Sequence, residues 1–100
     1  MEKRTPHYDL ARVQADVARL GAAAFTKSAL DGARAMGLLT SKMLNVIAAL
    51  TRRDFYKSMT TYADHRVWQD VYHAPTPVGR DAYIKITQRD AALVIQFKEK

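Results

Sequence analysis

The sequence predicts an α+β fold in which N-terminal helices pack on a C-terminal antiparallel sheet. Apolar residues in the first half recur at steps of three and four, the period of a helix face. After about residue 56 they recur every second residue, the period of a strand. Helices followed by strands, without strand–helix–strand alternation, favour an antiparallel sheet. The 100 residues suffice for one core and are too few for two, so a single domain is expected over residues 1–100.

Two helices are expected in the first third of the chain. Asp9 is suited to be the N-cap of the first helix, and Gly21 would end it. Thr26 would cap the second helix, which would end at Gly37. The faces that these helices would bury contain Leu10, Val13, Val17 and Leu20 in the first and Ala29, Ala33 and Met36 in the second.

A third helix is expected to begin at Thr40 or Ser41. Its buried face would contain Met43, Val46, Ile47 and Leu50. Between the first two helices, residues 22–25 form a short apolar segment that is expected to add an edge strand. After the third helix, Thr51 and Asp54 have the spacing of a capping box, which predicts one more short helical turn.

The first expected strand lies about two thirds of the way along the chain. It contains the strand formers Val67, Trp68, Val71 and Tyr72. Pro75 and Pro77 would close it, because proline has no N–H to donate within a sheet. Residues 73–80 are therefore expected to form a loop.

Two further strands, at 83–87 and 91–98, alternate in polarity and are expected to form a hairpin around a turn at 88–90. The buried face of this hairpin would contain Ile84, Ile86, Leu93, Ile95 and Phe97. The opposite face would gather Tyr83, Lys85, Gln96 and Lys98. Aromatic rings stack on bases and lysines hold phosphates, so this face suits RNA. The alternative is an ordinary solvated sheet face.

Composition excludes several classes of protein. The chain has 16 Lys and Arg against 10 Asp and Glu, a net charge of +6 that favours polyanionic partners. Cysteine is absent, which excludes disulfides and a thiolate metal site. No apolar run is long enough to span a bilayer, and none follows the basic N-terminus as it would in a signal peptide. A cytoplasmic protein is therefore expected.

Histidine and aspartate offer two other kinds of site. Asp64, His65, Asp70 and His73 could be combined into a metal-dependent nuclease site, but their spacing matches no standard ligand pattern. The two histidines could also act as an acid–base pair, although nothing in the sequence brings them together. Neither a metal nor a cofactor is therefore expected.

Several segments together resemble one family. The longest is DFYKSMTTY at 54–62; the others are MEKRTPH at 1–7, WQDVY at 68–72, YIKIT at 83–87 and FKEK at 97–100. In these segments and in their order, the chain resembles the motility quorum-sensing regulator (MqsR) toxins from its first residue to its last. The helical part at 9–50 matches by pattern more than by identity.

The resemblance implies an mRNA interferase, the ribonuclease toxin of a bacterial type II toxin–antitoxin pair, with a fold similar to the RelE-type toxins. Cleavage would need no metal and would favour GCU-type sites. The family's active-site residues match Lys57, Gln69, Tyr83 and Lys98. We expect Tyr56, Lys85 and Gln96 to contact the substrate as well.

The resemblance also implies a protein partner. Toxins of this family are neutralised by a cognate MqsA-like antitoxin with a zinc-binding and a DNA-binding region. The zinc would belong to the antitoxin, and this chain would meet DNA only through that partner. The alternative is a non-catalytic module that binds RNA or the antitoxin.

Overall fold

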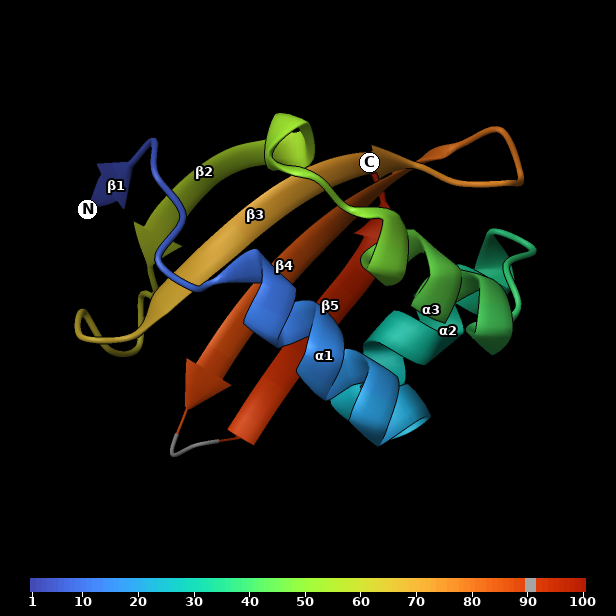
Figure 1. Cartoon of the computed structure of the whole chain (residues 1–100), viewed down its shortest axis with the longest axis horizontal. Coiled ribbons are helices and arrows are strands. Elements are labelled where there is room, and N and C mark those ends of the chain that lie inside the picture. The colour runs from blue at the N-terminus through green and yellow to red at the C-terminus, as the bar shows by residue number, and fades with distance from the viewer. Residues whose placement is uncertain (90–91) are drawn as a thin grey trace.

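The computed structural model describes residues 1–89 and 92–100, and in it five antiparallel strands form one sheet with helices over one face (Figure 1). Each strand pairs with its neighbours in the sequence, in the order β1-β2-β3-β4-β5. The strands are β1 Glu2–Lys3, β2 Phe55–Thr60, β3 Trp68–Pro75, β4 Asp81–Arg89 and β5 Ala92–Glu99. The helices are α1 Leu10–Leu20, α2 Lys27–Ala35 and α3 Thr40–Ala49, with short 3-10 turns η1 Gly21–Ala24 and η2 Arg52–Asp54. The predicted α+β fold class is confirmed.

The residues predicted to cap the helices form the expected hydrogen bonds. The Asp9 carboxylate accepts hydrogen bonds from the backbone N–H groups of Ala11 and Arg12, and the Thr26 hydroxyl accepts one from that of Ala29. After α2 the chain turns at Gly37, whose φ of 82° suits a residue without Cβ. The capping box at η2 is also present. Among the described residues, no helix is long and apolar enough to cross a membrane.

The expected edge strand at 22–25 is wrong for most of its length. Residues 22–24 belong to η1, because alanine has little preference for a strand and the chain has just turned at Gly21 with a φ of 62°. Only Phe25 reaches the sheet, where it forms an isolated parallel bridge with Ile95.

The strands are longer and more numerous than predicted. The expected loop at 73–80 begins too early, because β3 continues to Pro75. The expected turn at 88–90 is also misplaced, since Gln88 and Arg89 are the last residues of β4; Asp90 lies outside the described residues, as does Ala91 at the start of the predicted last strand. Strands β1 and β2 were not predicted at all.

One apolar core lies between the sheet and the helices. Its sheet side includes Tyr72, Ile84, Ile86, Ile95 and Phe97, all almost fully buried. Helix α2 lies so close to β5 that a Cβ on Gly32 would come within 3.1 Å of the Phe97 carbonyl oxygen. A glycine there lets the helix approach the strand without crowding this carbonyl group.

A buried carboxylate binds the N-terminal segment to the side of the sheet that the helices cover. The side chain of Asp70 is only 1% exposed. It accepts hydrogen bonds from the Ser58 hydroxyl at 2.7 Å and from the backbone N–H groups of His7 and Tyr8 at about 3 Å. The Tyr8 hydroxyl in turn donates to the Trp68 carbonyl at 2.8 Å. Asp70 therefore joins β2, β3 and the chain that leads into α1.

Replacing Asp70 by alanine is expected to destabilise the fold strongly. The change would leave the buried Ser58 hydroxyl and the partly buried N–H groups of His7 and Tyr8 without their acceptor, at a cost of about 3 kcal/mol. Urea denaturation would measure this as a fall in the free energy of unfolding. Asp16→Ala, which removes an exposed ion pair with Arg19, is the control and should change it by no more than about 0.5 kcal/mol. Equal effects of the two changes would contradict the role of Asp70.

Candidate active site

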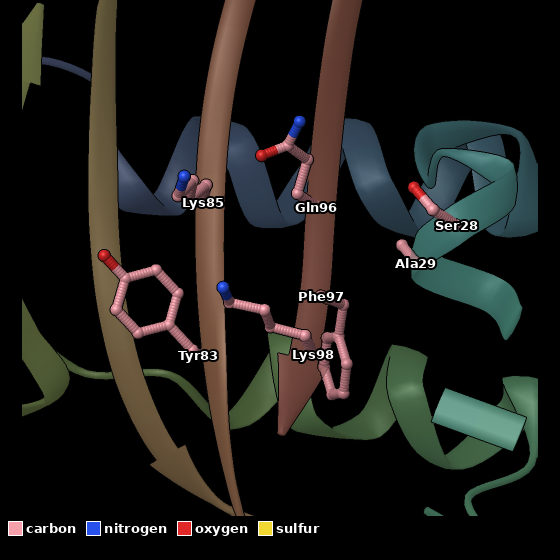
Figure 2. A pocket seen from close by; sticks show the side chains of 7 residues that line it. All are labelled: Ser28, Ala29, Tyr83, Lys85, Gln96, Phe97 and Lys98. Carbon is pink, nitrogen blue, oxygen red and sulfur yellow. The ribbon is translucent and has the colours of Figure 1, made fainter. Parts of the chain in front are cut away.

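The sheet surface turned away from the helices, here called the outer face, gathers the polar residues of β4 and β5. Tyr83 pairs with Lys98 and Lys85 pairs with Gln96 across the two strands. These four side chains project on the side of the sheet opposite the helices (Figure 2). The predicted division of the hairpin into a buried and an outer face is therefore confirmed.

The register extends the outer face across the neighbouring strands. One row of paired residues runs from Lys57 through Val71 and Lys85 to Gln96. The rows beside it contain His73, Tyr83 and Lys98 on one side and Met59, Gln69, Thr87 and Val94 on the other. The four residues singled out by the family resemblance, Lys57, Gln69, Tyr83 and Lys98, thus lie on one face and in three adjacent rows.

An irregularity in β2 brings a further aromatic ring to this face. The register shifts between Phe55 and Lys57, which leaves Tyr56 as the extra residue of a bulge. Phe55 still packs against the buried ring of Tyr72 in the core, at 5.5 Å between centroids. Tyr56 instead stacks on His73 of β3, at 4.4 Å, and remains 44% exposed.

Lysine ammonium groups surround the tyrosines of the outer face. Lys98 Nζ lies 5.3 Å and Lys85 Nζ 5.9 Å from the ring centroid of Tyr83. Lys57 Nζ lies 5.4 Å from the centroid of Tyr56. The electron-rich faces of the rings stabilise these cations. The three lysines form a positive field on which a phosphodiester could lie.

Lys57 is held by a carboxylate from β1. Its Nζ donates to Glu2 Oε1 at 2.8 Å. This hydrogen bond raises the pKa of the Lys57 ammonium group and lowers the pKa of the Glu2 carboxyl group. Because a raised lysine pKa keeps the ammonium form to higher pH, Lys57 carries its full positive charge throughout the neutral range.

Gln69 occupies the other end of the face. Its side-chain Nε2 donates to Thr87 Oγ1 at 3.2 Å across β3 and β4. The bond fixes the amide while leaving its carbonyl oxygen and second N–H for a ligand.

A shallow pocket of about 170 Å³ opens beside β5, where the outer face meets the start of α2 (Figure 2). Its walls are Ser28, Ala29, Tyr83, Lys85, Gln96, Phe97 and Lys98. It therefore combines two cations, an amide and two hydroxyls with the apolar residues Ala29 and Phe97, a mixture that suits part of a nucleotide.

The alternative metal site is not assembled. The Asp64 carboxylate is bound by Arg66, at 3.1 Å from Nε, and Asp70 is buried on the helix side of the sheet while His73 lies on the outer face. Within 1–89 and 92–100, no group of three or more histidine and acidic side chains is placed to hold a metal ion. The histidine pair fails for a related reason: His65 lies in the exposed loop between β2 and β3, and His73 lies within a strand.

Two residues of this face were missed by the sequence analysis. His73 was expected in a loop, yet it has the same parity in β3 as Gln69 and Val71, which would have placed it on the outer face. Glu2 gave no signal, because β1 has only two residues and pairs with a distant part of the chain.

Comparison with known proteins indicates the class of protein to which this chain belongs. The mRNA interferase toxin MqsR of Escherichia coli (strain K12) is 49% identical over 100 residues, which is the whole length of both chains. A full-length relative of this kind places the chain in the class of endoribonuclease toxins. The family model described as motility quorum-sensing regulator, toxin of MqsA, matches residues 5–99. The chain belongs to this toxin family, as its motifs predicted.

Replacing Glu2 by glutamine is expected to lower the pKa of Lys57. The change removes the negative partner that favours the ammonium form, so deprotonation should begin at lower pH than in the parent. The chemical shift of the Lys57 side chain, followed by NMR as the pH is raised, would measure the difference. The control is Glu99→Gln, which removes a carboxylate that pairs with Arg80 instead. An unchanged Lys57 titration in Glu2→Gln would contradict the ion pair.

Proposed function

We propose that this chain is the toxin of a type II toxin–antitoxin pair and cleaves mRNA at GCU-type sites without a metal ion. Membership of the toxin family supports the endoribonuclease activity. The observation that carries the rest of the proposal is the convergence of Lys57, Gln69, Tyr83 and Lys98 on one cationic sheet face.

The chemistry needs a nucleophile that the RNA itself supplies. The ribose 2′-oxygen would attack the adjacent phosphorus, the bond from phosphorus to the 5′-oxygen would break, and a 2′,3′-cyclic phosphate would form. The 2′-hydroxyl must lose a proton, and the leaving 5′-oxygen must gain one. Negative charge grows on the non-bridging oxygens along this path, so fixed cations lower the barrier.

Each polar residue of the face has a role in this scheme. Lys57 and Lys98 would hold the phosphate and oppose its developing charge. The Tyr83 ring centroid lies 5.3 Å from Lys98 Nζ and 5.9 Å from Lys85 Nζ, and its hydroxyl would orient the phosphate or exchange a proton with it. Gln69 would bind a base or phosphate through the amide groups left free by Thr87.

The surrounding residues would position the RNA. Tyr56 presents an exposed ring with Lys57 beside it, an arrangement that can stack a base and hold its phosphate. Lys85 and Gln96 line the pocket beside α2 and would contact the nucleotide next to the cleaved bond. RNA is thus expected to cross the strands from β2 toward α2.

The proposed partner is an MqsA-like antitoxin that binds zinc and DNA and neutralises this toxin in the cytoplasm. The family description, toxin of MqsA, supports a partner of this kind. DNA contact would belong to the antitoxin. The competing proposal, a module that binds RNA or antitoxin without cleaving, has the same basic face and is distinguished only by activity.

The first test is cleavage of a defined RNA with GCU sites in the presence of EDTA. We expect the parent to cut at those sites, and Lys57→Ala, Tyr83→Phe and Lys98→Ala each to lose about a hundredfold in kcat/KM. Gel analysis of end-labelled RNA would give the rates. Analysis of the new 3′ ends of the products would identify the 2′,3′-cyclic phosphate.

Lys42→Ala is the matched control, because this lysine is exposed on α3, on the opposite side of the sheet. It removes the same charge and should retain the parent's rate. RNA in which the GCU sites are altered tests the specificity. A folded parent that binds RNA and never cleaves it would favour the non-catalytic module, and full activity in Tyr83→Phe and Lys57→Ala would overturn the assigned roles.

A further inference from the structure

His73 is the middle ring of a three-ring aromatic stack on the outer face. Its centroid lies 4.4 Å from that of Tyr56, with 23° between the ring planes. On its other side the centroid of Tyr83 lies 5.1 Å away, with the planes tilted by 39°. One imidazole therefore contacts both tyrosines that the proposed reaction uses, one from β2 and one from β4.

The imidazole has a buried nitrogen without a partner. Its Nε2 is closed off from solvent and makes no hydrogen bond within residues 1–89 and 92–100. In the neutral ring this nitrogen can remain a bare acceptor, whereas the imidazolium carries an N–H at both nitrogens. A buried N–H without an acceptor is costly, so the stack accommodates the neutral ring better than the charged one.

The charges around the ring act in the same direction. Burial and the nearby Lys100 lower the pKa of His73, and Asp81 opposes them only in part. The rings stacked on His73 are themselves bordered by cations. The titratable and charged groups that surround the stack are Tyr56 and Lys57 of β2, Asp81, Tyr83 and Lys85 of β4, Lys98 of β5, Lys100 beyond it, and Arg4 beside Tyr56.

We propose that His73 is a positioning residue of the active site, which in its neutral form fixes the rings of Tyr56 and Tyr83 for RNA and releases them when it is protonated. This proposal rests on the proposed function of the outer face. It adds a residue that touches no reacting atom and that acts through the two tyrosines on either side of it.

The expected effect is on catalysis more than on binding. Small displacements of a group that must meet the reacting phosphate reduce the rate steeply, whereas the lysines that hold the RNA stay in place. Loss of the stack should therefore lower kcat and leave KM nearly unchanged. The same loss should appear in the parent when acid pH protonates His73.

Two variants separate the ring from its charge. His73→Phe keeps a planar ring between the tyrosines and cannot be protonated, while His73→Ala removes the ring. Steady-state cleavage should be measured for both and for the parent between about pH 4 and about pH 8, a window that extends below the range in which histidine ordinarily titrates. Circular dichroism would verify that each variant is folded.

We expect His73→Ala to lose about tenfold in kcat at neutral pH with KM nearly unchanged. His73→Phe should keep the parent's neutral rate and lack the parent's decline in acid. Because the pKa of His73 is lowered, the cleavage rate of the parent should fall at pH values below those at which histidine ordinarily titrates. The parent should also lose thermal stability relative to His73→Phe as the pH falls, because its unfolded state then binds more protons.

Opposite results overturn the proposal in distinct ways. Full kcat in folded His73→Ala would show that the stack is not needed. A loss in His73→Phe as large as in His73→Ala would make the imidazole itself essential. An acid decline that persists in His73→Phe would assign the titration to another group. If His73→Ala does not fold, the His73→Phe pH profile still decides.

An NMR titration tests the stack without any cleavage. The ring signals of Tyr56 and Tyr83 should shift with the same midpoint as the imidazole of His73 in the parent, and this shift should be absent in His73→Phe. If the parent fails to cleave RNA but these signals still titrate together, the proposed function fails while the stack stands. Independent titration of the rings would overturn the stack itself.

Discussion

The strict alternation of side chains along β4 and β5 is the constraint on which the outer face depends. Ile84 and Phe97 are buried against the helices, and this forces Tyr83 and Lys98, their neighbours in sequence, to the other side. A slip of one residue in the register would bring the lysine into the core and the isoleucine to the surface. The apolar core therefore fixes the positions of the polar residues on the opposite face.

β2 joins the face by departing from this alternation. With Lys57 on the outer face, a regular strand would have turned Tyr56 inward and Phe55 outward, away from the buried ring of Tyr72 on which it packs. The bulge places Tyr56 and Lys57 together on the outer face and leaves Ser58 facing inward to Asp70. The strand then depends on a buried hydrogen-bond network in place of apolar packing at that point. Stability and site geometry are thus linked through one irregular pair of strands.

The regularity of each strand decided whether it could be predicted from the sequence. The β4–β5 hairpin and its faces could be predicted, because apolar and polar residues alternate from Tyr83 to Thr87 and from Ile95 to Lys98. β2 could not, because the bulge and the inward-facing Ser58 disturb the period that identifies a strand. The family motifs named the residues of the face, while their arrangement in rows, and the place of His73 among them, required the register.

The ion pair between Glu2 and Lys57 has a consequence for the kind of ligand that the face admits. The carboxylate is part of the same chain, so it competes for Lys57 at the high effective concentration of a tethered group. A mononucleotide makes few contacts, so competition for Lys57 removes a large share of its binding free energy. A long polynucleotide contacts several cations at once, so the same competition removes only a small share. If the face binds RNA as proposed, Glu2 would therefore favour polymers over free nucleotides.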